Sequence, residues 1–89
     1  MKRIVLDSAH FKDRREAHRY LKDVLHFPDY YGENLDALHD CLEELSEPIE
    51  IVVPEVIMED GYLGDYGNIM IQVFLDTEME NPNLEVTVG

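Results

Sequence analysis

The sequence has no tryptophan, a single cysteine and no apolar run near the ~20 residues that span a bilayer. Cys41 therefore has no partner for an internal disulfide, and no membrane helix is predicted. The first apolar stretch, Ile4–Leu6, is too short for a signal peptide, so we expect a cytoplasmic protein. With 89 residues, the chain is expected to form one domain, residues 1–89, without the deep interdomain cleft that often holds a cofactor. No cofactor is expected.

Basic residues are missing from most of the chain. All seven Lys and Arg lie in the first 22 residues beside three acids, whereas residues 23–89 hold the other seventeen acids. The first part carries +4 and the rest −17, which gives a net charge of −13. Such a surface repels nucleic acid and anionic lipid and attracts basic partners. We therefore expect a monomer that binds neither nucleic acid nor membrane, with solubility as the alternative reason for the charge.

The spacing of apolar residues predicts an α/β fold. Strands are expected at Ile4–Leu6, Ile49–Val53 and Leu84–Val88. Helices are expected over about 14–25, 33–45, 55–60 and 69–80. Asp13 is the predicted cap of the first helix and Asn68 that of the last. This order indicates a three-stranded, largely parallel sheet packed with about four helices.

The helix expected over 33–45 has an apolar and an acidic face. The apolar face holds Leu35, Leu38, Cys41, Leu42 and Leu45. The opposite face, here called the acidic row, holds Glu33, Asp36, Asp40, Glu43, Glu44 and Glu47. Like charges four residues apart cost about 0.2–0.5 kcal/mol per pair, and this helix has no Lys or Arg to offset them. We therefore interpret the acidic row as a binding face for a cation-rich partner rather than as an ordinary solvated face.

Two adjacent tyrosines precede this helix. Aromatic side chains on a loop offer rigid contact area of the kind that anchors interfaces. We expect Tyr31 to pack into the core and Tyr30 to lie outside. Gly32 either lets a partner's backbone approach closely or adopts a positive φ.

The segment Tyr30–Leu42, YYGENLDALHDCL, resembles the signature of the barstar family, intracellular inhibitors of barnase-type ribonucleases. The similarity extends over essentially the whole chain and includes Pro28, Pro48 and the Gln72–Phe74 segment. It implies a three-stranded parallel sheet with helices and an inhibitor rather than an enzyme. In this family the second helix and the preceding loop plug the active site of a basic ribonuclease made by the same cell.

The resemblance also assigns roles to single residues. Asp40 matches the aspartate that occupies the phosphate-binding site of the ribonuclease, and Asp36 matches a second carboxylate contact. Tyr30 matches a residue that stacks on the catalytic histidine of the ribonuclease. Gly32 and Asn34 match residues of the loop that contact the enzyme. Further predicted contacts come from the second helix and from one position in the last helix. The full set of predicted partner-binding residues is Tyr30, Gly32, Asn34, Asp36, His39, Asp40, Glu43, Glu44 and Asp76.

The sequence departs from the family pattern at several points, three of which are single replacements. His39 and Leu45 stand where the family inhibitor has tryptophans, and Asp76 replaces a glutamate that pairs with a basic side chain. The acidic centre is kept while the contacts around it change. Because specificity depends on such flanking contacts, the changes predict a different basic ribonuclease as the partner.

Other classes of function remain as alternatives. Asp36, Asp40 and Glu44 could chelate a hard cation, but neither a calcium-loop pattern nor zinc-ligand spacing is present, so no metal is expected. His10, His18 and His26 are expected to be solvated or to cap helix ends, and Cys41 to pack in the core. His39 and Asp40 are neighbours on a helix and diverge by about 100°, so they form no catalytic pair and no catalytic residue is predicted. An acidic module for another basic protein, of the DNA-mimic or toxin-immunity type, is the alternative binding function.

Overall fold

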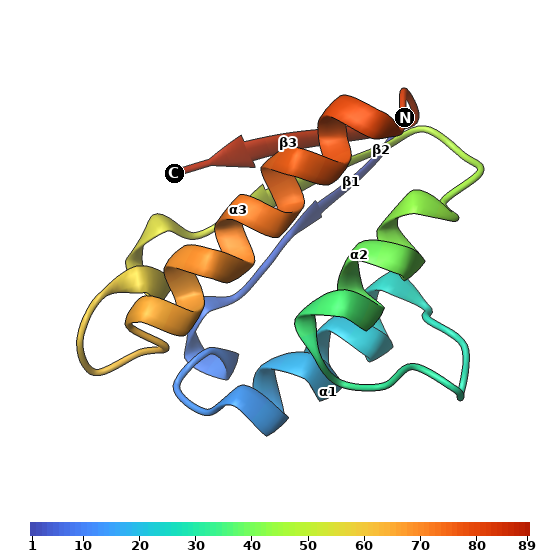
Figure 1. The fold of residues 1–89 in the computed structure, drawn as a ribbon. Coiled ribbons are helices and arrows are strands. Elements are labelled where there is room, and N and C mark those ends of the chain that lie inside the picture. Colours follow the sequence, from blue (N-terminus) through green and yellow to red (C-terminus); the bar gives the residue numbers. More distant parts are fainter.

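The computed structural model describes all 89 residues and contains a three-stranded sheet and three α-helices (Figure 1). The strands, all parallel and in the order β1-β2-β3, are β1 (Lys2–Val5), β2 (Ile49–Val53) and β3 (Leu84–Val88). The helices are α1 (Arg14–Leu25), α2 (Leu35–Glu43) and α3 (Asp65–Glu80), with 3-10 turns η1 (Ser8–His10) and η2 (Glu55–Met58). The predicted fold class is confirmed, although the helix expected over 55–60 is only the turn η2. None of the three helices has the length and the apolar character that a membrane span requires.

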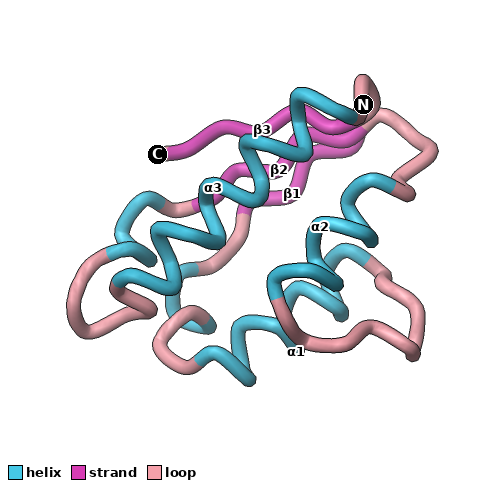
Figure 2. The backbone as a smooth tube through the Cα atoms, viewed as in Figure 1, coloured by secondary structure: helices cyan, strands magenta, loops and turns pink.

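All three helices lie on one side of the sheet (Figure 2). The connections β1–β2 and β2–β3 step across the sheet in the same direction, and right-handed crossovers then place their helices on the same face. Burial agrees, because Ile49, Ile51 and Val53 of β2 are buried whereas the alternating Glu50 and Val52 are only half-buried. The sheet is thus covered on one face and open on the other.

The first strand differs from its prediction at both ends. It starts at Lys2 and ends at Val5, one residue before the apolar run does. Val5 lies on the open face of this edge strand and is 57% exposed, while Leu6 turns into the core. A short apolar run thus predicted the strand but not which of its residues are buried.

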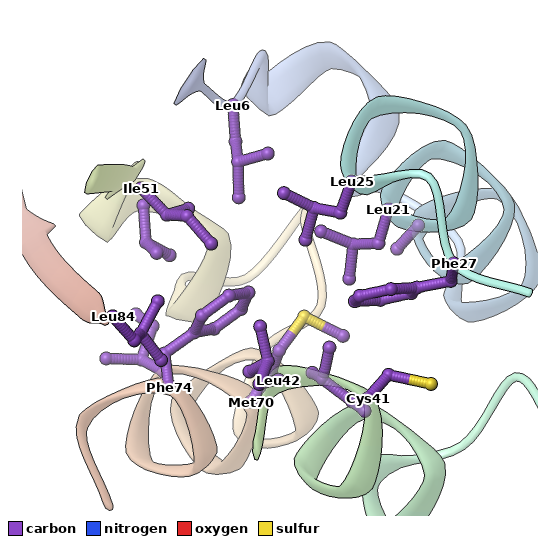
Figure 3. Packing of buried hydrophobic residues seen from close by; sticks show 14 of the residues in the cluster. Leu6, Leu21, Leu25, Phe27, Cys41, Leu42, Ile51, Met70, Phe74 and Leu84 are labelled. Carbon is purple, nitrogen blue, oxygen red and sulfur yellow. The ribbon is translucent and has the colours of Figure 1, made fainter. Parts of the chain in front are cut away.

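The core fills the space between the sheet and the inner faces of the helices (Figure 3). Its labelled members come from all layers: Leu6, Leu21, Leu25, Phe27, Cys41, Leu42, Ile51, Met70, Phe74 and Leu84. Leu38, Cys41 and Leu42 bury the predicted apolar face of α2, which packs against α3. Because these side chains fix the rotation of α2, its acidic face is turned to solvent.

The start of α1 follows the sequence signal, whereas the start of α3 does not. The Asp13 carboxylate accepts a hydrogen bond from the Glu16 N–H at 3.0 Å, as predicted for a cap. The prediction that Asn68 caps α3 is wrong, because the helix begins at Asp65 and includes Gly67 in its first turn. A Cβ on Gly67 would lie 2.0 Å from the carbonyl oxygen of Ile57, so glycine here permits close packing on η2 rather than breaking the helix.

Candidate functional site

The start of α2 is fixed by Asn34. Its Oδ1 accepts from the Ala37 N–H at 2.8 Å and its Nδ2 donates to the Gly32 carbonyl at 3.2 Å, so α2 begins at Leu35, two residues later than predicted. The positive φ considered for Gly32 belongs instead to Glu33, at 54°. A Cβ at Gly32 would lie 3.1 Å from Asn34 Nδ2, so glycine leaves room for the cap. The loop is therefore closed onto the helix by its own residues.

The two tyrosines point in opposite directions, as predicted. Tyr31 is 6% exposed and its ring lies 4.9 Å from that of Phe27. Tyr30 is 75% exposed, and its hydroxyl lies 3.5 Å from a carboxylate oxygen of Glu44. The negative charge of Glu44 raises the pKa of Tyr30. One aromatic ring thus holds the loop from inside, while the other is free to contact a partner.

Six of the nine predicted binding residues line one surface hollow of about 360 Å³ between the loop and α2. They are Tyr30, Gly32, Asn34, Asp36, Asp40 and Glu44. The three carboxylates are exposed, and none of them forms an ion pair with Lys or Arg. The hollow therefore presents carboxylate oxygens beside an aromatic ring, an arrangement suited to basic side chains.

His39 lies at the border of this face and faces three acids. Its Nε2 is 3.2 Å from Glu80 and 3.4 Å from Glu43, and its Nδ1 is 3.6 Å from Asp40. Burial lowers the pKa of His39, but the hydrogen bond and charge of Glu80, with smaller contributions from Asp40 and Glu43, outweigh it and raise the pKa overall. The imidazole of His39 therefore joins α2 to α3.

Glu80 was not among the predicted site residues. Gln72, Asp76 and Glu80 follow one another at intervals of four on α3, and a search of that helix face could have found Glu80. Asp76 is exposed and its Oδ1 accepts from Gln72 Nε2 at 3.4 Å. It lies one turn before Glu80, outside the hollow, on the face of α3 that reaches His39.

The side chains around His39 also bring possible metal-ligand atoms close together. One atom each from His39, Glu43 and Glu80 lie within 4.8 Å of one another. The sets considered from the sequence were Asp36–Asp40–Glu44 and His39–Asp40–Cys41, and neither is gathered in this way. The imidazole draws both glutamates toward it, so ion pairing accounts for the geometry of the cluster.

The basic first part of the chain, residues 1–22, reaches the acidic row. Arg14 and Arg15 of α1 line a second hollow, of about 540 Å³, together with Glu33, Asn34, Leu35, Asp36 and Tyr66. The Arg14 guanidinium stacks over the Tyr66 ring at 4.2 Å from its centroid. The charges that are separated along the sequence therefore meet at the start of α2.

Two predictions about side chains off this face had different outcomes. Cys41 is buried in the core, as predicted, and burial raises the pKa of its thiol. His18 was expected to be solvated or at a helix end, but it lies within α1 and is 1% exposed. The nearby acids suggested solvent, whereas its spacing of three and seven residues from the buried Leu21 and Leu25 places it on the inner face of α1.

The fold and the hollow define a small α/β protein that presents an acidic helix face and an exposed tyrosine to solvent. The sequence matches the family model described as Barstar (barnase inhibitor) over residues 1–88. It is also 37% identical over 81 residues to a Bacillus subtilis (strain 168) protein named "Putative ribonuclease inhibitor YrdF", covering 90% of this chain and 89% of the relative. The chain therefore belongs to the barstar family. These descriptions are of inhibitors, in agreement with the prediction that the chain is not an enzyme.

Proposed function

We propose that this protein inhibits a basic ribonuclease by inserting α2 and the preceding loop into its active site. Membership of the barstar family and the name of the Bacillus subtilis relative support ribonuclease inhibition. The observation that carries the mechanism is the exposed set Asp36, Asp40 and Glu44, which no Lys or Arg of the same chain neutralises. The protein would act as a monomer in the cytoplasm of the cell that makes the ribonuclease.

The chemistry of the target explains why carboxylates suit it. A ribonuclease binds the phosphates of RNA through cationic side chains, and carboxylates can occupy the same positions. Asp40 is the candidate for the phosphate site, with Asp36 as a second contact and Tyr30 stacking on a histidine of the enzyme. The acidic face would also raise the rate of encounter with a basic enzyme, an effect that weakens with salt.

The residues around Asp40 bear on which kind of ribonuclease the protein would bind. Leu45 is half-buried and packs against the core, so only part of a small aliphatic side chain is presented at that position. His39 is held toward α3 by Glu80 and Glu43. The central carboxylates are therefore flanked by an imidazole instead of large aromatic rings, which favours a partner with a smaller or more polar rim.

The experiment is a calorimetric titration of the protein with a barnase-type ribonuclease at two salt concentrations. Asp40→Asn removes one charge from the hollow. Glu85→Gln removes one charge from an exposed position of β3 and is the matched control. We expect tight, salt-sensitive binding that Asp40→Asn weakens and Glu85→Gln leaves intact. Equal effects of the two variants would contradict the mechanism.

The alternative of a DNA mimic or another acidic module makes a different prediction. A mimic needs charge spread over a long surface, so replacing Asp36, Asp40 and Glu44 with amides would leave it partly active. The same triple variant should abolish an inhibitor that inserts one helix. Absence of binding to a barnase-type enzyme would direct the titration to the cell's own basic ribonucleases.

A further inference from the structure

His18 connects three separate parts of the chain from inside the core. It is 1% exposed and projects from α1. Its Nδ1 lies 2.6 Å from the hydroxyl of Tyr31, in the loop before α2, and its Nε2 lies 2.7 Å from the hydroxyl of Tyr66, in the first turn of α3. Both ring nitrogens of His18 therefore have a tyrosine partner.

The neutral imidazole fits this position. It has one donor and one acceptor nitrogen, so one tyrosine donates to the ring and the other accepts from it. Burial lowers the pKa of His18, opposed in smaller part by the charge of Glu33, and burial also raises the pKa of Tyr31. The ring and the hydroxyl thus stay uncharged at neutral pH, and no buried polar side-chain atom is left without a partner.

The loop has few other attachments. The backbone of residues 28–33 makes no hydrogen bond to the backbone of a helix or strand. Its two hydrogen bonds are local, from Tyr31 N–H to the Pro28 carbonyl and from Asn34 Nδ2 to the Gly32 carbonyl. An exposed ion pair joins Lys22 to Asp29 at 3.6 Å, and such pairs contribute little. The buried Tyr31–His18 hydrogen bond is therefore the polar contact that fixes the loop to α1.

We infer that His18 is a positioning residue for the proposed inhibition, holding Tyr31, and with it the Tyr30–Asn34 segment, in the conformation that meets the ribonuclease. Tyr66 completes the device, because its hydroxyl holds the far side of the His18 ring while Arg14 stacks on its own ring. The inference rests on the proposed function. A loop fixed before binding loses less conformational freedom on association, which raises affinity.

The test uses His18→Phe and Tyr31→Phe. Val53→Ala, at a fully buried position of β2 away from the loop, is the control that destabilises the fold. Two quantities are measured where every variant is folded: affinity for the ribonuclease, and amide hydrogen exchange at Tyr31 and Ala37 of the free protein. We expect both loop variants to bind about three- to tenfold more weakly and to exchange these two amides faster, since a net hydrogen bond is worth that much. Val53→Ala should leave affinity unchanged.

The double variant should bind no more weakly than His18→Phe, because the Tyr31–His18 hydrogen bond that Tyr31→Phe removes is already lost in His18→Phe. The inference is wrong if Tyr31→Phe has the same amide exchange rates and the same affinity as the unaltered protein. It is also wrong if Val53→Ala weakens binding and speeds exchange as Tyr31→Phe does. Should His18→Phe fail to fold, Tyr31→Phe still decides, since it removes a single oxygen. If the unaltered protein binds no ribonuclease, the proposed function fails, whereas the exchange rates still report whether His18 holds the loop.

Discussion

The imidazole of His39 lies 3.2 Å from the carboxylate of Glu80 and joins α2 to α3 across 41 positions of sequence. The contact sits at the edge of the acidic hollow, so the same histidine stabilises the fold and borders the proposed interface. Its charge also offsets part of the repulsion among Asp40, Glu43 and Glu80.

Stability should therefore depend on the protonation of His39. Because the pKa of His39 is raised above 6.5 in the folded protein, its contribution is complete below pH 6.5 and is lost as pH rises through the raised value. The loss should stay below about 1 kcal/mol, since the cluster is partly exposed. Urea unfolding at pH 5.5 and 8 should show a larger difference between the unaltered protein and His39→Gln at the lower pH.

His18 contributes a pH dependence of opposite sign. Its lowered pKa means that stability is complete above pH 6.5 and falls as pH drops from 6.5 toward the folded value. Tyr31 and Tyr66 hydrogen-bond to the ring and the charge of Glu33 acts on it, and the His39→Gln variant keeps all three residues. Comparing the unaltered protein with each single variant, rather than reading one pH profile, separates the two histidines.

The carboxylates should differ in their importance for binding. Asp40→Ala is expected to weaken the complex most, by about a hundredfold or more, because it removes a charge from the centre of a desolvated contact. Asp36→Ala and Asp76→Ala should have smaller effects, Asp76 lying outside the hollow. Titration of each variant with the ribonuclease gives the ranking. If Asp76→Ala cost more than Asp40→Ala, the assignment of the centre would be wrong.

Replacing Leu38 should affect the fold rather than the interface. Its side chain is fully buried beneath the acidic face of α2. Leu38→Ala is expected to lower the free energy of unfolding by about 2–5 kcal/mol, through lost burial and the cavity left behind. Urea denaturation measures this directly. Where the variant is folded, its affinity should be reduced far less than that of Asp40→Ala.

Gly67 should tolerate no side chain. Because a Cβ there would lie 2.0 Å from the Ile57 carbonyl oxygen, Gly67→Ala must push η2 and α3 apart. We expect a lower free energy of unfolding by about 1–3 kcal/mol, the range of overpacked cores. Asn68→Ala, at the next and exposed position, is the control and should be close to neutral. Equal melting temperatures for Gly67→Ala and the unaltered protein would contradict the packing argument.

Patterns confined to one helix turn or one strand were predicted well. The alternation of apolar and acidic residues placed Leu38, Cys41 and Leu42 inside, and the spacing of Asp13 and Glu16 predicted the first cap. The start of α3 was missed because Gly67 is a poor helix former in isolation. Its value lies in a contact with Ile57, which belongs to a different element.

The sequence by itself determined the order of strands and helices, the acidic face of α2 and the opposite directions of Tyr30 and Tyr31. Each follows from spacing along a few residues, since helix periodicity and side-chain hydrophobicity act locally. Only the tertiary structure decided that His39 meets Glu80, that His18 lies between Tyr31 and Tyr66, and that Arg14 stands beside the start of the acidic row. The crossovers of a parallel sheet bring these distant positions together, and no local pattern encodes which of them touch.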